Sequence, residues 1–230
     1  MWYINNKKWI YKVNYCKIFR YISIKSYIAN IKEGGAYMKD SIYPQMKIIE
    51  NENYILRPIT LNDANSMFEY YSQEKVVKYL PINAHKSVSE TRRFIKSNFI
   101  DKYKDGRVSH WAIIDKHNSK LIGNIGLNDV GPRDKQAEIG ICINPLYWGN
   151  DIATELTKNS LRYGFEYLKL EKLIAVTYED NMKTRKSLES LGFKYIRSYN
   201  KKIITIIGFK NITCHRYELL RRDYILGKYL

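Results

Sequence analysis

The stretch AEIGICINPLYWGNDIATE, residues 137–155, is the feature that most constrains how this chain can fold. Its beginning predicts a strand that ends at Asn144 and Pro145, and a helical pattern follows from about residue 150 to residue 168. A short loop with Gly149 joins the two. Backbone N–H groups and the positive end of the helix dipole meet at the start of such a helix and favour a pyrophosphate there. Many strand-loop-helix units bind nothing, so a binding role and a purely structural role are equally open at this point.

The remaining pattern predicts an α/β domain. Two helices follow the first strand, and each begins with a capping sequence, at Thr60 and at Ser87. The turn at residues 116–119 joins two strands into a hairpin. Gly192 is expected to end the last helix. The predicted strands cover residues 54–58, 109–115, 120–129, 137–143, 173–177, 194–198 and 214–220, and the later helices cover residues 150–168 and 181–191.

Composition fits one ordinary domain with some additional chain. Of the 230 residues 45% are hydrophobic, which is enough to bury a core, and no apolar run approaches the length that crosses a bilayer. The net charge of +16 invites a nucleic-acid interpretation. The basic residues after residue 37 are scattered, however, and no nucleic-acid motif accompanies them. We therefore expect a basic, solvated surface, with neither a nucleic acid nor a membrane as partner.

The three cysteines, Cys16, Cys142 and Cys214, are odd in number and far apart, and none belongs to a CxxC sequence. Neither a disulfide framework nor a zinc site is indicated. We expect a reducing, cytoplasmic location and no metal.

The first 37 residues differ in composition from the rest of the chain. They contain no Leu, Asp, Thr or Pro and are rich in Ile, Asn, Lys and Tyr. The continuous apolar segment and the small-residue cleavage site of a signal peptide are missing. A basic, aromatic tail at a membrane surface is one interpretation of this segment.

The genetic code offers a different explanation, which we favour. Residues 32–35, KEGG, can be encoded by codons that contain a bacterial ribosome-binding sequence shortly before Met38. We therefore expect residues 1–45 to be an N-terminal extension that includes a translated leader, with the true start at Met38 or Met46. Residues 46–225 are then the working domain.

A second motif lies near the C-terminal end of the predicted domain. Residues 181–193 read NMKTRKSLESLGF and resemble the NxxSxxxLEKLGF segment of the GNAT superfamily of N-acetyltransferases. Residues 137–155 resemble the acetyl-CoA signature of the same superfamily, in which an AEIGY-like strand runs into a WGKGYATE-like loop and then a helix. Similarity to the branch that contains the ribosomal-protein alanine acetyltransferases is found at residues 56–58, 111–113, 121–123 and 215–220.

The resemblance implies a single α/β (α+β) domain whose mixed, mostly antiparallel sheet splays open and is flanked by helices. Acetyl-CoA, as co-substrate, is expected in the cleft. Backbone groups of Ile141, Cys142 and Ile143 are expected to pair with its pantetheine arm like an added strand. Asn181 is expected near the thioester. The pyrophosphate is expected in the loop and helix start formed by Trp148, Gly149, Asn150, Asp151, Ile152 and Ala153.

Two positions depart from the family's pattern. Asp151 stands where the family generally has Gly, which brings a carboxylate near the phosphates unless it points away or caps the helix. Leu188 stands where many members have a Tyr as general acid, and Leu cannot donate a proton. A proton for the departing thiolate would then come from Thr184, from water or from Tyr217.

Glu138 is the candidate general base. An aliphatic amine has a pKa of about 10 and must lose a proton before it attacks the thioester. Glu138 lies on the strand expected beside the pantetheine, although a solvated or salt-bridged carboxylate is an equally open interpretation. Cys142 has no paired His, so a structural role is preferred to that of a nucleophile. His110 and His215 are more simply explained as packed side chains than as catalytic ones.

The resulting hypothesis is direct transfer of an acetyl group from acetyl-CoA to a primary amine, either a protein N-terminus or a small molecule. A CoA-binding regulatory module without turnover is the alternative, motivated by Asp151 and Leu188. A homodimer is left open, and no motif names the acceptor.

Overall fold

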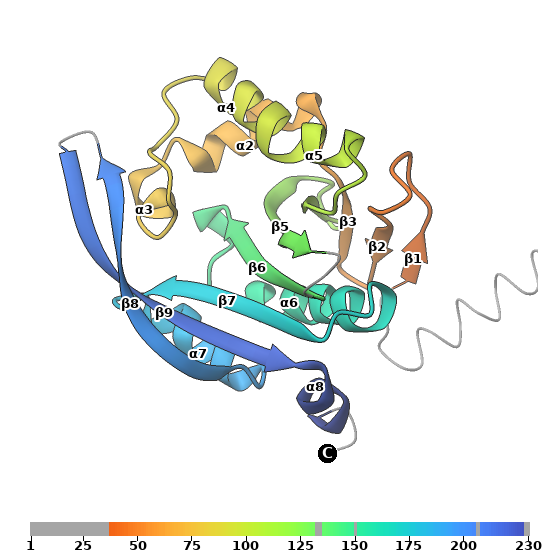
Figure 1. Cartoon of the computed structure of the whole chain (residues 1–230). Helices are drawn as coiled ribbons and strands as arrows, with labels where there is room; N and C mark the ends of the chain where they lie inside the picture. Colours follow the sequence, from red (N-terminus) through yellow and green to blue (C-terminus); the bar gives the residue numbers. More distant parts are fainter. Residues whose placement is uncertain (1–36, 132–134, 150, 206–207, 228–230) are drawn as a thin grey trace, which may run out of the picture.

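The computed structural model describes residues 37–131, 135–149, 151–205 and 208–227. They form a nine-stranded sheet in the order β1-β2-β3-β4-β5-β6-β7-β9-β8 (Figure 1). Every neighbouring pair is antiparallel except β6 and β7, which are parallel. The strands are β1 (Tyr37–Lys39), β2 (Ile48–Glu50), β3 (Tyr54–Pro58), β4 (His110–Asp115), β5 (Leu121–Gly131), β6 (Gln136–Ile143), β7 (Lys172–Tyr178), β8 (Lys194–Thr205) and β9 (Gly208–Leu220).

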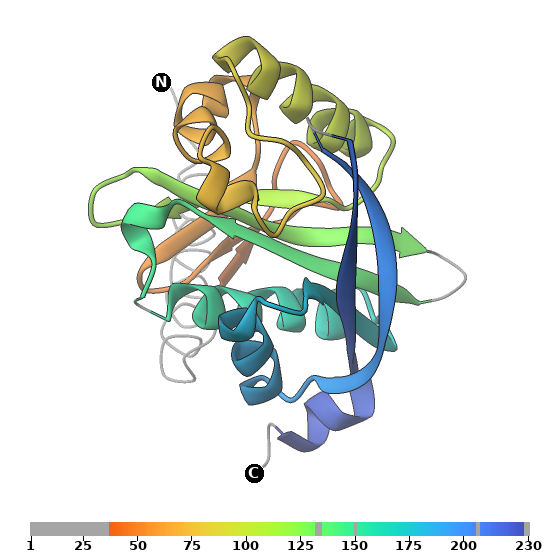
Figure 2. The same ribbon diagram turned by 90° about the vertical axis from the view of Figure 1, so that its left-hand side faces the viewer.

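Two layers of helices cover the sheet, one on each face (Figure 2). The first layer consists of η1 (Leu61–Asp63), α2 (Ala64–Tyr71), α3 (Glu74–Val77), α4 (Val88–Ile95), the π-helical turn η2 (Lys96–Ile100) and α5 (Asp101–Lys104). The second layer consists of α6 (Ile152–Arg162), its π-helical continuation η4 (Tyr163–Tyr167) and α7 (Met182–Ser190). The turn η3 (Pro145–Tyr147) follows β6, and α8 (Arg221–Gly227) follows β9. The predicted mixed, mostly antiparallel sheet flanked by helices is confirmed.

The predicted helix ends have the expected local chemistry. The backbone N–H of Thr60 donates to Asp63 Oδ2 at 2.7 Å, and the N–H of Glu90 donates to Ser87 Oγ at 3.2 Å. Each contact satisfies a donor that the start of a helix would otherwise leave without a partner. Gly192 follows α7 with a φ of 86°, a left-handed conformation that suits glycine.

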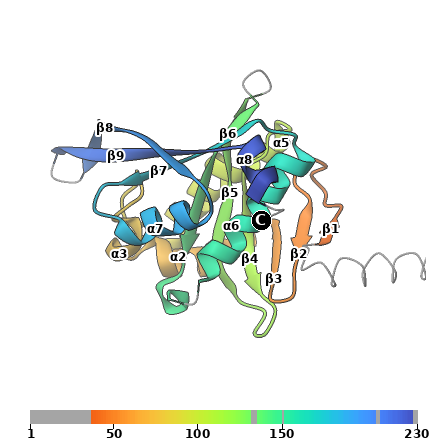
Figure 3. The ribbon, with the colours of Figure 1, turned by 90° about the horizontal axis from the view of Figure 1, so that it is seen from below.

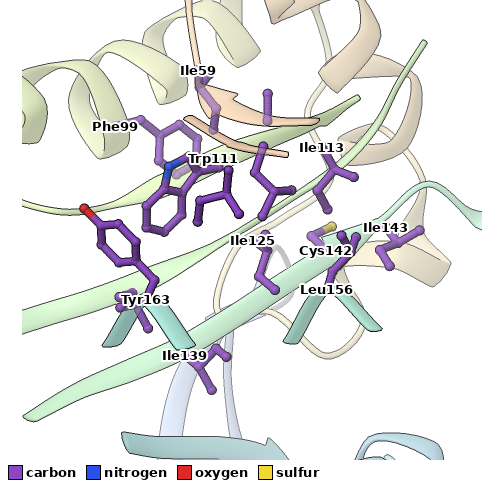
Figure 4. Packing of buried hydrophobic residues seen from close by; sticks show 14 of the residues in the cluster. Ile59, Phe99, Trp111, Ile113, Ile125, Ile139, Cys142, Ile143, Leu156 and Tyr163 are labelled. Atoms are coloured by element: carbon purple, nitrogen blue, oxygen red, sulfur yellow. The ribbon is translucent and has the colours of Figure 1, made fainter. Parts of the chain in front are cut away.

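The core beneath α6 and η4 is built around a buried tryptophan. The Trp111 ring packs edge-on against Tyr163 with 4.9 Å between centroids, and its Nε1 donates to the carbonyl of Lys47 at 2.7 Å. Ile125 and Leu156 are fully buried beside them (Figure 4). The apolar positions of β4 and β5 thus hold α6, the helix that begins next to the predicted cofactor loop.

Several elements differ from the prediction. β8 and β9 are longer than the predicted strands at residues 194–198 and 214–220, and they form a hairpin that reaches toward the layer of α2 and α4 (Figures 1 and 2). Residues 200–202 of β8, NKK, are exposed and polar, so this part of the strand lacks the apolar alternation that marks a strand in a sequence. The short elements β1, β2, α3 and α8 were not predicted, because three to seven residues carry too little periodicity.

The sheet begins before the predicted domain limit at residue 46. β1 pairs with β2 from Tyr37 with Glu50 onward. Ser41 Oγ donates to the carbonyl of Met46 at 2.6 Å. The chain from Tyr37 therefore belongs to the described fold. The predicted leader falls mostly outside the described residues and stays a prediction.

Within the described ranges, no helix is both long and apolar enough to cross a bilayer. The predicted cytoplasmic location, the open homodimer and the expected lack of a nucleic-acid partner stay predictions.

Candidate active site

The sheet opens between β6 and β7. These strands pair only from Gln136 with Lys172 to Glu138 with Ile174. Beyond this point β6 pairs with β5 alone and β7 pairs with β9 alone, and the two strands diverge toward their carboxyl ends (Figure 1). Each presents to the opening an edge without a strand partner, and such an edge can take up an extended ligand as an added strand.

Two helices begin at the mouth of this opening. α6 follows β6 and α7 follows β7, and they lie side by side on one face of the sheet (Figure 3). The hydroxyls of Thr154 and Ser187 join them at 2.8 Å. Asn181 Oδ1 accepts from the N–H of Thr184 at 3.4 Å and caps α7. The positive ends of both helix dipoles face this region, which favours an anionic group.

The loop before α6 contains two residues in the left-handed conformation. Gly149 has a φ of 95° and Asp151 a φ of 50°. The indole Nε1 of Trp148 turns back and donates to the carbonyl of Ile143 at 2.8 Å. The carbonyl of Ile143, one of the predicted cofactor-binding residues, therefore already accepts a hydrogen bond within the protein. Asn150 lies outside the described residues.

The side chain of Asp151 is exposed and makes no capping hydrogen bond with α6. Its carboxylate therefore stays as a negative charge at the helix start where the pyrophosphate is expected. Ile152 is buried in the core and Ala153 packs against it. These two residues can offer backbone N–H groups to a ligand, whereas their side chains serve the fold.

Glu138 lies at the inner end of the opening, as the last residue of β6 that pairs with β7. Its side chain is half-buried, and burial raises the pKa of its carboxyl group. The charge of Asp129 raises this pKa further, while Lys201 and Arg216 lower it. A carboxylate with a raised pKa is a better proton acceptor near neutral pH.

The structure does not bring Tyr217 to Glu138. Tyr217 pairs with the β7 residue next to Ile174, and Ile174 pairs with Glu138, so the two side chains lie on opposite faces of the sheet. Tyr217 is fully buried, and its hydroxyl accepts from Arg185 Nε at 3.2 Å and donates to Glu189 Oε1 at 3.4 Å. These contacts hold the hydroxyl against α7.

The remaining candidate donor, Thr184, and the residue at the position of the family's tyrosine, Leu188, both lie on α7. Thr184 is half-buried in the first turn of the helix, close to the mouth of the opening. Leu188, one turn later, is buried in the core. Thr184 thus keeps a hydroxyl on the helix that borders the opening, and its role as an acid stays a prediction.

A buried polar cluster next to the opening was missed by the sequence analysis. Tyr70 OH and Tyr71 OH contact Asn124 Oδ1 at 2.8 and 3.1 Å. Asn124 Nδ2 contacts His110 Nδ1 at 2.9 Å, and the other ring nitrogen of His110 contacts the Asn128 amide at 3.1 Å. The available signal was the spacing of Asn124 and Asn128 within an otherwise apolar strand, which places both on one face.

Burial decides the protonation of two groups in this region. It lowers the pKa of His110 to about 3, so the imidazole is neutral at physiological pH. It raises the pKa of Cys142 to about 12, so the thiol stays protonated and is a poor nucleophile. The preferred structural role of Cys142 is thereby supported. His215 is also buried, on the face opposite Glu138.

In the part of the chain that the structure describes, no three His, Cys, Asp or Glu side chains gather into a metal-binding group.

The chain is similar to known acetyltransferases. A family model described as acetyltransferase (GNAT) domain matches residues 53–194. The uncharacterized N-acetyltransferase p20 of Bacillus licheniformis is 30% identical over 182 residues, which make up 78% of this chain and 99% of that protein.

Two solved structures share the fold. The spermidine N-acetyltransferase from Vibrio cholerae, in complex with CoA and spermine, has a TM-score of 0.65 at 21% identity, over 75% of this chain and 98% of that one. The ribosomal-protein-S5-alanine acetyltransferase from Vibrio fischeri has a TM-score of 0.64 at 18% identity, over 77% of this chain and 98% of that one.

Proposed function

The chain belongs to the GNAT family of acetyltransferases and is an acetyl-CoA-dependent N-acetyltransferase, and we propose that its acceptor is a primary amine that attacks the thioester directly in the opening between β6 and β7. The observation that carries this proposal is the loss of β6–β7 pairing after Glu138. It leaves a strand edge for the pantetheine arm, and a half-buried carboxylate lies at the inner end of that edge.

We assign the pantetheine arm to the backbone of β6 at Ile141, with Ile143 contributing less because Trp148 already donates to its carbonyl. The predicted contribution of Cys142 is not kept, because the alternation of the ladder turns its backbone groups toward Asn124 in β5. The pyrophosphate is assigned to the start of α6, where unpaired N–H groups and the helix dipole favour negative charge. Asn181 caps the neighbouring α7 and is assigned to the thioester end. The exposed carboxylate of Asp151 opposes phosphate binding in this arrangement.

Glu138 is proposed to accept the amine proton. The protonated amine first gives one proton to Glu138, directly or through a water. The neutral nitrogen then forms a bond to the thioester carbonyl carbon, the carbon–sulfur bond breaks and CoA leaves as a thiolate. The thiolate takes up a proton from a donor in the site, and the second proton lost by the nitrogen replaces it. Burial supports this role, since a carboxylate in water would have too low a pKa to hold the proton well.

The donor to the thiolate is proposed to be Thr184 or a water next to it. Thr184 lies in the first turn of α7, beside the opening. Tyr217 is the less favoured donor, because it is fully buried and its hydroxyl is held against α7 by Arg185 and Glu189.

Both acceptor classes from the sequence analysis, protein N-termini and small-molecule amines, agree with the relatives' chemistry. Neighbours of this fold include a spermidine acetyltransferase and a ribosomal-protein alanine acetyltransferase. The test is release of CoA thiol from acetyl-CoA with a panel of polyamines, monoamines, amino acids and peptides that begin with different residues. Turnover with one class identifies the acceptor. Binding of acetyl-CoA without turnover across the panel would favour the regulatory module instead.

A further inference from the structure

We propose that Asn128 is a positioning residue for this reaction, which donates a hydrogen bond from its amide NH₂ group toward Glu138 and is held in that orientation by the buried His110. The proposal rests on the role of Glu138 as base. It follows from which atoms donate and which accept in the buried cluster, which extends from α2 to the opening.

The cluster begins at two buried tyrosines. Tyr70 is fully buried, and its hydroxyl has one hydrogen-bond partner among the described residues, Asn124. If the Asn124 NH₂ group faced the tyrosines, the Tyr70 hydroxyl proton would be buried without an acceptor, which is strongly unfavourable. Asn124 therefore presents Oδ1 to the hydroxyls of Tyr70 and Tyr71, and its NH₂ group faces His110.

This orientation fixes the tautomer of His110. Asn124 donates to Nδ1 at 2.9 Å, so Nδ1 carries no proton. A neutral imidazole has one N–H, which must then be on Nε2. Nε2 contacts the side-chain amide of Asn128 at 3.1 Å, so Asn128 must present its carbonyl oxygen there. Its NH₂ group is left pointing away from His110, and it has no other hydrogen bond within the described residues.

The neighbour available to that NH₂ group is Glu138. Asn128 in β5 and Glu138 in β6 are directly paired, so their side chains leave the same face a few ångströms apart. Gly140 leaves room for the contact between Asn128 and His110: a Cβ at this position would lie 3.2 Å from His110 Cε1 and 3.4 Å from the Asn128 amide atom that faces His110. The cluster thus reaches β6 at the beginning of its unpaired edge.

A hydrogen-bond donor beside Glu138 affects the pKa and the orientation of its carboxyl group. The charged groups that act on this carboxyl are Asp129, Lys201 and Arg216, and the titratable groups coupled to it are Tyr199 and Cys214. The Asn128 NH₂ group adds a neutral donor from β5. It favours the ionised, proton-accepting form of Glu138 and orients the carboxylate.

The tautomer is measured directly by ¹⁵N NMR of the histidine side chains, with His110 assigned from the spectrum of His110→Gln. We expect a neutral ring with the proton on Nε2 from about pH 5 to pH 8. A proton on Nδ1, or titration of His110 in this range, would overturn the proposal. This result does not depend on any activity, so its failure is distinct from failure of the proposed function.

The effect on Glu138 is measured from the pH dependence of kcat/KM. Asn128→Asp keeps an acceptor for His110 but replaces the donor with a negative charge, so the acidic limb should move up by about one pH unit. Asn128→Ala removes the donor without adding a charge, together with the acceptor for His110, and should lower kcat with little change in the acetyl-CoA KM. The matched control is Asn211→Asp, which adds the same charge on an exposed site of β9 that faces the other side of the sheet. An unmoved acidic limb in Asn128→Asp, or a kcat of wild-type size in Asn128→Ala, overturns the proposal.

Discussion

Replacing Asp151 with Asn or with Gly separates two effects of this residue on acetyl-CoA binding. Its backbone is left-handed, with a φ of 50° and a ψ of 12°, and its exposed carboxylate caps nothing. Asn tolerates the same backbone conformation and removes only the charge. Gly removes the charge and also the steric cost of the conformation.

The size of the charge effect follows from Coulomb's law. Two unit charges about 4 to 8 Å apart in a water-like medium repel by on the order of 0.5–1 kcal/mol. Removing this repulsion between Asp151 and a phosphate should tighten acetyl-CoA binding by about two- to fivefold. The left-handed conformation costs Asp151 on the order of 1 kcal/mol, and Gly removes this cost. The gain is partly offset because Gly raises the entropy of the unfolded chain, so the Gly variant should gain up to about 2–4 °C in Tm.

Calorimetry of acetyl-CoA binding at about 0.05 M and 0.5 M salt distinguishes these effects. Both variants should bind more tightly at low salt, and the gain should shrink at high salt because exposed charges are screened. Asp105→Asn, which removes an exposed acid from the turn after α5, is the matched control and should leave the affinity unchanged. An unchanged dissociation constant for Asp151→Asn at low salt would refute the assignment of the pyrophosphate to this loop.

Four further changes test the chemistry and the start of the fold. Glu138→Gln should lower kcat by roughly 10² with acetyl-CoA affinity within a fewfold. Full kcat in the Gln variant would mark Glu138 as structural. Because burial raises the Glu138 pKa, the kcat/KM of the wild type should fall as the pH decreases, with a midpoint above the ordinary glutamate pKa. Thr184→Val should lower kcat about tenfold or more, whereas Tyr217→Phe should reduce Tm and leave kcat near wild type; the opposite pattern would make Tyr217 the acid. A chain that begins at Met46 should melt about 6 to 12 °C below one that begins at Met38. It loses β1 and about three hydrogen bonds of about 1 kcal/mol each. Equal Tm values would show that β1 contributes little.

Elements with strong local chemistry were predictable from the sequence. The strand at residues 54–58 coincides with β3, and the capping sequences at Thr60 and Ser87 begin helices, because these signals depend only on residues that are neighbours along the chain. The strand and helix of residues 137–155 were found for the same reason. The outer part of β8 was missed because its partner in the hairpin, and not its own pattern, makes it a strand.

The acceptor side of the site depends on strand register, which a single sequence does not specify. His110 lies opposite Gly126 in β5, and this register sets it between Asn124 and Asn128. A shift of one residue would turn His110 away from both amides. The same holds for Tyr217, which lies on the face opposite Glu138 because it pairs with Ala175 and not with Ile174 in β7.

The two halves of the opening are therefore built in different ways. The proposed cofactor half uses the backbone edge of β6 and the starts of α6 and α7, which many sequences can supply, and neighbours at 18–21% identity keep this fold. The proposed acceptor half uses side chains that three strands must bring together, with Glu138, Asn128 and His110 each on a different strand. Substitutions on the acceptor half should therefore change which amine is acetylated, and how fast, while acetyl-CoA binding is largely retained.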